Sequence, residues 1–264
     1  MLARRELPPE FEAWNRRWGA PLGRWVVSGA LDEARQFGLD YRLAKVFGPF
    51  GFQRNSPTRA HEFPWAYHAI EPKPGLRVLE IGGALAGLQF VLSKEGCEVH
   101  NVDPFFDYGS GGYRVDPETR HRQLNRTFKA KATLHRSTLP DAKLDGAFDV
   151  IYSVSALEHI PQEPLEETLA VARQLLSPSG RIVLTVDLFL NLSPFSRRET
   201  NQWGSNVAPK WIEKVLGMKL VEGSKAELLG YDEFSSEMIL EHLEDYALNP
   251  DYPQLAQLMV FAPS

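Results

Sequence analysis

Two acidic residues and a turn of small residues have the types and spacing to bind a nucleoside. Glu80 is followed by Gly82 and Gly83, and Asp103 lies 21 residues beyond Gly82. Glycine adopts backbone angles that side chains forbid, so a ligand can approach the main chain closely at such a turn. A helix that begins after the turn would offer unpaired N–H groups to polar ligand atoms. A carboxylate such as Asp103 could accept two hydrogen bonds from a ribose diol.

Further candidate residues follow the neighbouring predicted strands. An aromatic ring, Phe105 or Phe106, comes soon after Asp103 and could pack on an adenine base. Ser137 and Thr138 follow the third predicted strand. These residues extend the predicted site along one edge of a sheet.

Each of these features also has a purely structural interpretation. A glycine-rich turn is a common connection between a strand and a helix. Asp103 precedes Pro104, and an aspartate there can be a turn residue that hydrogen-bonds its own backbone. The combination of both acids with the glycines at this spacing favours the ligand site.

The elements that would position these residues alternate between strands and helices from residue 75 onward. Strands are predicted at 77–81, 98–102, 132–136, 148–153, 181–187, 219–222 and 257–262, and helices at 85–95, 117–129, 164–176, 209–216 and 232–247. This alternation predicts an α/β fold, a Rossmann-like and mainly parallel sheet with helices on both faces. Ligands bind such sheets at the carboxyl ends of the strands.

Two regions are predicted, a helical N-terminal cap over residues 1–74 and an α/β domain over 75–264. In the cap, Phe11, Trp14 and Trp18 have helical spacing after a Pro-Pro pair, and further helices are predicted at 32–47 and 59–70. The α/β domain carries insertions near 104–131 and 188–208. Within them, 108–113 contains three glycines and 191–206 is polar, so both are predicted to be loops, the second a lid.

Composition narrows the classes of partner. The chain has 264 residues, with 29 basic against 34 acidic side chains, which disfavours nucleic acid. The single cysteine, Cys97, excludes an internal disulfide and favours a reducing cytoplasm. No apolar stretch approaches the roughly 20 residues of a membrane span, so no membrane partner is expected. The composition sets no oligomeric state.

Four stretches of the sequence follow one another in a recognisable order. They are VLEIGGALAG at 78–87, EVHNVDP at 98–104, FDVIYSVSALEHIP at 148–161 and LLSPSGRIVLTVD at 175–187. In order, spacing and type they resemble the class I S-adenosylmethionine-dependent methyltransferases. The resemblance covers about 75–187 and returns weakly at 211–223. It implies S-adenosylmethionine as cofactor and a seven-stranded sheet whose last strand is antiparallel.

The resemblance implies a role for each matching residue. Glu80 would support the turn and the amino group of the methionine part, and Asp103 would bind the ribose. Ser137 stands where the family usually has an acid that faces the adenine amine. Arg59, which could equally be a surface arginine, would pair with the cofactor carboxylate. The predicted cofactor-binding set is Arg59, Glu80, Gly82, Gly83, Ala84, Asp103, Pro104, Phe105, Ser137, Thr138, Ser153 and Ser155.

The chain departs from the family pattern in the turn. Ala84 and Ala86 replace the second and third glycines. Alanine is unfavourable at positive φ, so a turn that needs positive φ at residue 84 would be strained or inactive. A helix that begins earlier would make Ala84 harmless, and we favour this second interpretation. The departures leave open a non-catalytic binding protein.

The expected chemistry is in-line methyl transfer to a small-molecule acceptor, a sugar or a secondary metabolite, with oxygen as the methylated atom. An alcohol must lose its proton, so a general base would help, and His159 and Asp187 are the candidates. Both could instead be structural. No pair of histidines or acids has metal-ligand spacing, so no metal is proposed. A nicotinamide-dependent oxidoreductase is a lesser alternative, because 82–87 is one residue from a dinucleotide fingerprint.

Overall fold

The computed structural model describes residues 1–19, 48–50, 56–106, 116–192, 195, 200–249 and 254–263. Over these residues the chain forms a seven-stranded sheet in the order β3-β2-β1-β4-β5-β9-β8. The strands are β1 (Arg77–Ile81), β2 (Glu98–Val102), β3 (Thr133–His135), β4 (Phe148–Val154), β5 (Leu176–Phe189), β8 (Lys219–Glu222) and β9 (Gln254–Ala262). Strands β1 to β5 pair in parallel, and β9 is antiparallel to both β5 and β8. The predicted Rossmann-like sheet with an antiparallel last strand is confirmed.

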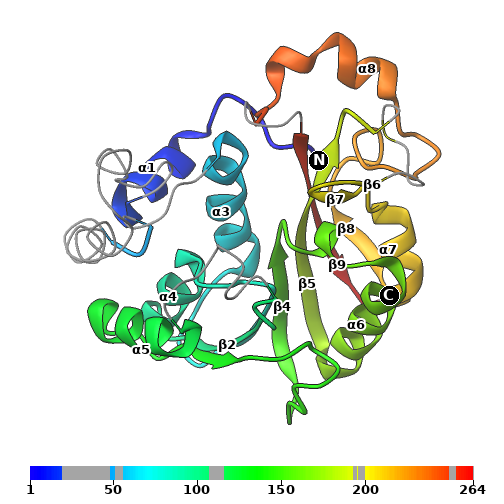
Figure 1. Ribbon diagram of the computed structural model, residues 1–264. Helices are drawn as coiled ribbons and strands as arrows, with labels where there is room; N and C mark the ends of the chain where they lie inside the picture. The colour runs from blue at the N-terminus through cyan, green and yellow to red at the C-terminus, as the bar shows by residue number, and fades with distance from the viewer. Residues whose placement is uncertain are drawn as a thin grey trace.

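Helices cover both faces of the sheet (Figure 1). Helices α3 (Pro57–Ile70), α4 (Gly87–Lys94) and α5 (Pro117–Phe128) share a core with Val78, and α6 (Gln162–Leu175) and α7 (Pro209–Leu216) share a second core with Leu79. Successive strand residues point to opposite faces, so the apolar run of β1 supplies both cores. This arrangement leaves the carboxyl ends of the strands as the edge where polar residues gather.

Helix α1 (Pro9–Trp18) confirms the predicted N-terminal helix and packs against α3. Its aromatic side chains Phe11, Trp14 and Trp18 are buried in the core that also contains Val78. They are therefore committed to packing rather than to a ligand. The predicted helix at 32–47 and the predicted loop at 108–113 lie outside the described residues.

Several predicted boundaries are wrong. Where a helix is predicted at 232–247, the structure has a short helix α8 (Ser236–Glu241) followed by a 3₁₀ turn, η2 (Leu243–Asp245). The helix begins late because Ser235 is its N-cap, and the Ser235 hydroxyl accepts a hydrogen bond from Met238 N. The predicted loop at 191–206 contains a two-stranded hairpin, β6 (Thr200–Asn201) and β7 (Gly204–Ser205). Here Asn201 Oδ1 accepts from two turn N–H groups. No helix in the described part of the chain has the length and apolarity needed to cross a bilayer.

Candidate active site

A cavity of about 720 Å³ opens at the carboxyl ends of β1, β2 and β4. Of the predicted site residues it is lined by Gly82, Ala84, Asp103, Pro104, Phe105, Ser137, Thr138, Ser155 and His159. The other predicted residues do not line it: Arg59, Glu80, Gly83, Ser153 and Asp187. Sequence reasoning missed the second side of the cavity, which is formed by Ala156, Ile160, Pro161, Pro164, Glu167 and Thr168. That side follows β4, and its nearest signal was the Ala-Leu-Glu-His-Ile-Pro stretch.

The turn after β1 needs its two glycines for different reasons. Gly82 has φ +71°, and a Cβ there would lie 2.6 Å from the Cβ of Ala156. A Cβ on Gly83 would lie 2.1 Å from the Glu80 carboxyl carbon. The turn therefore closes over the Glu80 side chain on one side and meets η1 and its flanking residues on the other. Here η1 is the 3₁₀ helix Leu157–His159.

Ala84 does not start a helix. The favoured interpretation of this alanine is wrong, because α4 begins only at Gly87 and Ala84 has φ +43°. A left-handed conformation costs a residue with a Cβ about 1–2 kcal/mol. The backbone of Ala84 is held in this conformation by side chains, since its N–H donates to Asp103 Oδ2 at 2.8 Å and its carbonyl accepts from Asn101 Nδ2 at 2.7 Å.

Backbone strain concentrates around the cavity. Ala84, Phe105 and Ser155 all have positive φ, at +43°, +51° and +40°, and all three line the cavity. Two of the other non-glycine residues with positive φ, Glu71 and Lys129, are ordinary helix C-caps. Residues in sparsely populated backbone regions cluster at functional sites. The distribution of strain therefore marks this cavity independently of its chemistry.

Asp103 is partly engaged by the backbone. Its Oδ2 accepts from Ala84 N and its Oδ1 accepts from Phe105 N, each at 2.8 Å. A carboxylate offers about four acceptor positions, so Asp103 keeps the capacity for further bonds. Of the two neighbouring rings, Phe105 is buried, whereas Phe106 is 82% exposed at the cavity. Phe106 is thus the ring that a planar ligand can reach.

Glu80 carries a buried oxygen without a partner. No described residue donates a hydrogen bond to its Oε2. Burial raises the pKa of Glu80 to about 8, and the negative charge of Asp103 acts in the same direction. A cationic or N–H group placed at the turn would satisfy this oxygen and favour its ionised form. The residues therefore fit a cofactor that brings an amino group next to an adenosine.

Behind the cavity, Arg59 of α3 lies in a buried group of three carboxyl side chains. Its Nη1 atom is 2.6 Å from Glu62 Oε2 and 3.9 Å from Asp187 Oδ1. Glu158 belongs to the same group, and its Oε1 accepts from Asp187 N at 3.3 Å. Glu62 also accepts from the hydroxyl of Ser155, a cavity residue, at 2.5 Å. Arg59 is therefore a half-buried residue that ion pairs fix beside the cavity, and not a solvent-exposed arginine.

The charges of this group follow from burial and from Arg59. Burial acts to raise the pKa of Glu62, but the Arg59 charge and the hydroxyl donors of Ser155 and Thr185 outweigh it, so this pKa lies below its ordinary value. Burial raises the pKa of Glu158 to about 7 and that of Asp187 well above its usual range. The group therefore holds the ion pair Arg59–Glu62, and burial acts against a charge on Asp187.

Ser153 and Thr138 are tied to neighbours. Ser153 is fully buried and its hydroxyl donates to the carbonyl of Ile81 at 2.8 Å. Thr138 donates to Asp141 Oδ2 at 2.6 Å at the cavity rim. Among the described residues, no group of three histidine, cysteine or acidic side chains is arranged to hold a metal ion.

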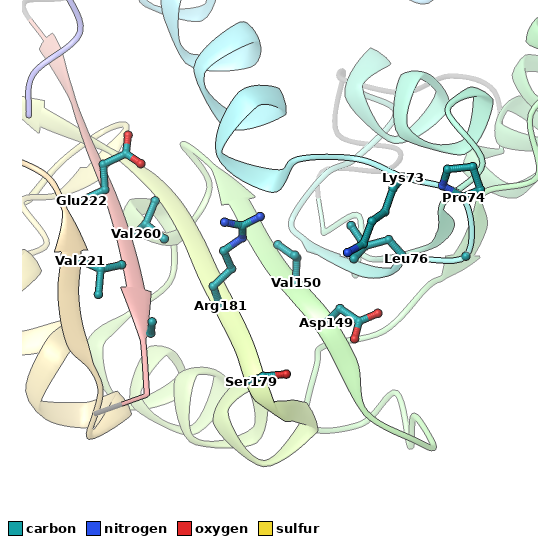
Figure 2. A pocket seen from close by; sticks show the side chains of 12 residues that line it. Lys73, Pro74, Leu76, Asp149, Val150, Ser179, Arg181, Val221, Glu222 and Val260 are labelled. Carbon is teal, nitrogen blue, oxygen red and sulfur yellow. The ribbon is translucent and has the colours of Figure 1, made fainter.

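A second hollow, of about 610 Å³, lies at the opposite end of the parallel strands, at the starts of β1 and β4 (Figure 2). Apart from Lys73, its charged side chains have structural partners. Asp149 accepts from the main chain of β1, Arg181 pairs with Glu71, and Glu222 accepts from the indole of Trp65. No non-glycine residue that lines this hollow has a positive φ, in contrast to the first cavity, which remains the candidate site.

Comparisons with known proteins agree with this geometry. Residues 52–215 match the family described as a methyltransferase domain. The fold is similar to that of YcgJ from Bacillus subtilis, at 12% identity, 77% of this chain, 98% of that chain and a TM-score of 0.55. It is also similar to magnesium protoporphyrin IX methyltransferase from Synechocystis PCC 6803 with bound SAH, at 15% identity over 96% of this chain and 94% of that chain, with a TM-score of 0.50. A third similar structure is coclaurine N-methyltransferase bound to N-methylheliamine and SAH, at 12% identity over 80% of this chain and 75% of that chain, with a TM-score of 0.52.

A search of the curated proteins found no match. The family match covers more than half of the chain, and the matched residues include the glycine turn after β1 and Asp103 after β2. A nicotinamide-dependent oxidoreductase is therefore not the explanation of this site. The chain belongs to the methyltransferase-domain family, the class I S-adenosylmethionine-dependent methyltransferases.

Proposed function

We propose that this chain methylates a hydroxyl group of a small molecule, such as a sugar or a secondary metabolite. The observation that carries the proposal is the position of His159, which lines the same cavity as Asp103 and Gly82. The cavity volume of about 720 Å³ lies within the range of about 300–1,000 Å³ that is usual for small-molecule sites. A donor and a small acceptor can therefore share one enclosure.

The cofactor would lie along the turn. Asp103 would accept hydrogen bonds from the ribose diol, and Phe106 would cover the adenine. Ser137 and Thr138 line the cavity and would lie at its adenine end. Glu80 and Arg59 lie behind the cavity and not on its lining, so they would favour the amino and carboxylate groups of the methionine part by their position beside the turn and by their charge. When bound, S-adenosylmethionine supplies a methyl group on a positively charged sulfur.

His159 has the hydrogen-bond pattern of a base. Its Nδ1 contacts the main-chain carbonyl of Trp203, which can only accept, so Nδ1 carries the proton. Nε2 of the neutral ring then keeps a lone pair, and no described residue donates to it. As an acceptor hydroxyl forms its bond to the methyl carbon, Nε2 would take the hydroxyl proton. Asp187 is a weaker candidate because it is fully buried and does not line the cavity.

Charge and the solved relatives support a small acceptor. The net charge of −5 offers no attraction to a polyanion. Two similar structures are named as methyltransferases of magnesium protoporphyrin IX and of coclaurine, which are both small molecules. Because the second is an N-methyltransferase, the atom that accepts the methyl group has to be tested directly.

The test uses matched acceptor pairs. Labelled S-adenosylmethionine is offered with sugars and phenolic metabolites, each beside the amine analogue of the same scaffold. We expect label in a hydroxyl compound as a base-stable ether and at least tenfold slower transfer to its amine partner. Label found only in amines, or only in protein, would overturn the proposal.

Asp103→Ala should weaken the binding of S-adenosylhomocysteine by about 1.5–3 kcal/mol, because charge-assisted hydrogen bonds to the ribose are lost. Calorimetry with the purified protein measures this directly. Asp103→Asn is the companion variant: it removes the charge and keeps one acceptor oxygen, so one of the two backbone N–H groups at Ala84 and Phe105 can still be bound. Wild-type affinity in the alanine variant would remove Asp103 from the cofactor site.

A further inference from the structure

We propose that Asn101, Gln89 and His121 form a side-chain clamp that positions the cofactor turn and replaces the conformational freedom of the missing glycine. The inference rests on the cofactor site described above and is independent of the acceptor. The three residues come from β2, α4 and α5, and none lines the cavity. They act on the ligand only through the backbone of residues 83–86, so they are positioning residues.

The bonds of the clamp converge on a single loop. Asn101 accepts from Gly83 N at 3.2 Å and donates to the Ala84 carbonyl at 2.7 Å. Gln89 Nε2 donates to the carbonyls of Ala84 at 3.3 Å and Ala86 at 3.1 Å. The backbone is thereby held before Ala84, at Gly83 N, and after it, at the carbonyls of Ala84 and Ala86. With Asp103 bound to the Ala84 N–H, the left-handed residue is held from three directions.

The directions of these bonds are uniquely determined. Backbone carbonyls only accept, so Gln89 Nε2 and Asn101 Nδ2 must be the amide nitrogens. Gln89 Oε1 is then the acceptor for Asn101 Nδ2 at 3.3 Å and for His121 Nε2 at 2.9 Å. His121 must be neutral with its proton on Nε2, and its Nδ1 can accept from Asn125 at 3.3 Å. Each N–H group of the Asn101, Gln89 and His121 side chains therefore meets an acceptor.

Burial shows that the clamp is more than local packing. Gln89 and Asn101 are fully buried and His121 is 3% exposed, in a core otherwise formed by residues such as Phe90 and Val99. Buried amides are costly unless all their bonds are made, and apolar residues of similar size would serve packing alone. Burial also lowers the pKa of His121 to about 4, which keeps it neutral as the bond pattern requires.

The consequence concerns the alanines of the turn. A glycine at residue 84 would enter the left-handed region without a steric cost. Ala84 enters it at a cost, and the clamp supplies the bonds that hold it there. The replaced glycine is therefore compensated by side chains, and the turn keeps the shape that presents Asp103.

The test is a double-mutant cycle read as affinity for S-adenosylhomocysteine without acceptor. Asn101→Ala should weaken binding about tenfold, which corresponds to about 1.4 kcal/mol. Ala84→Gly alone is measured as the fourth corner of the cycle, so that its own effect on affinity is subtracted. In the double variant, Ala84→Gly should recover at least half of the loss on a logarithmic scale, because glycine no longer needs the clamp.

Asn206→Ala is the matched control. Asn206 is a buried asparagine that also binds a backbone N–H and carbonyl, those of Phe189, away from the turn. It should lower the unfolding temperature as Asn101→Ala does and leave the affinity unchanged. If Asn101→Ala does not fold, Gln89→Met replaces it in the same cycle. Wild-type affinity in the single clamp variant, or no recovery by Ala84→Gly, would overturn the inference, and neither result depends on which acceptor is methylated.

Discussion

His159→Asn should lower kcat for hydroxyl methylation by about 10²- to 10⁴-fold, the usual contribution of a positioned general base. Asparagine can place its amide nitrogen near the position of Nδ1, so the contact with the Trp203 carbonyl can be kept. The variant lacks the second ring nitrogen, and with it the atom that would take the acceptor proton. The affinity for S-adenosylhomocysteine should stay unchanged, which separates a catalytic loss from a collapsed site.

His242→Asn is the control for this variant. His242 is exposed, and its Nδ1 also contacts a main-chain carbonyl, that of Met238, at 3.0 Å. His242 is the C-cap of α8 and does not line the cavity, so the kcat of the His242→Asn variant should equal that of the wild type. A His159→Asn enzyme with wild-type kcat on a hydroxyl acceptor would show that the histidine only anchors the hairpin of β6 and β7.

The fold was readable from the sequence because its signals are local and periodic. The segments at 77–81 and 98–102 became β1 and β2 without a change of boundary, since glycine or proline bounds each of them: Gly75 and Gly82 for the first, Gly96 and Pro104 for the second. The start of α4 was misjudged because Ala84 and Ala86 suit a helix equally well by propensity. What decided their conformation was a set of hydrogen bonds from other elements, which propensity does not contain.

The candidate site was readable only in part for the same reason. Glu80 and Asp103 could be predicted from their residue type and their spacing. Glu62 was missed although it lies on the same helix face as Arg59, three residues on, because an acid at that spacing is also typical of a solvent-exposed pair. The tautomer of His159 depends on a carbonyl 44 residues away in sequence, and such a contact exists only once the chain has folded.

Arg59→Met should lower the free energy of unfolding at pH 7 by about 3–5 kcal/mol, because it leaves the buried Glu62 carboxylate without its partner. The side chain of Glu62 is fully buried, and Arg59 is only 20% exposed. Methionine fills a similar volume without charge, so the loss reports the missing ion pair more than a cavity. Urea unfolding followed by circular dichroism measures the change.

Lowering the pH should favour the folded state of the Arg59→Met variant, whereas it removes the stability that the Arg59–Glu62 ion pair contributes in the wild type. In the wild type the pKa of Glu62 is lower when folded than when unfolded, so its contribution is present above the unfolded value, near 4.5, and is lost as the pH falls through the folded pKa. Without Arg59, the largest of the effects that lower this pKa is gone, so burial, opposed only by the hydroxyls of Ser155 and Thr185, should raise the pKa of Glu62. The folded variant then takes up a proton more readily than the unfolded chain, so lowering the pH from 7 toward 5 should reduce its deficit relative to wild type.

Arg16→Met tests whether the effect is specific to burial. Arg16 pairs with Glu12 at 3.2 Å on α1, but both side chains are more than half exposed. Such a surface pair contributes about 0.3–0.5 kcal/mol, so its loss should change stability little at either pH. The double variant Arg59→Met with Glu62→Gln should recover part of the deficit at pH 7, because no buried charge remains. A deficit that is the same at pH 5 and pH 7 would mean that Glu62 is not the group left unpaired, and that Arg59 stabilises the fold through packing rather than through its charge.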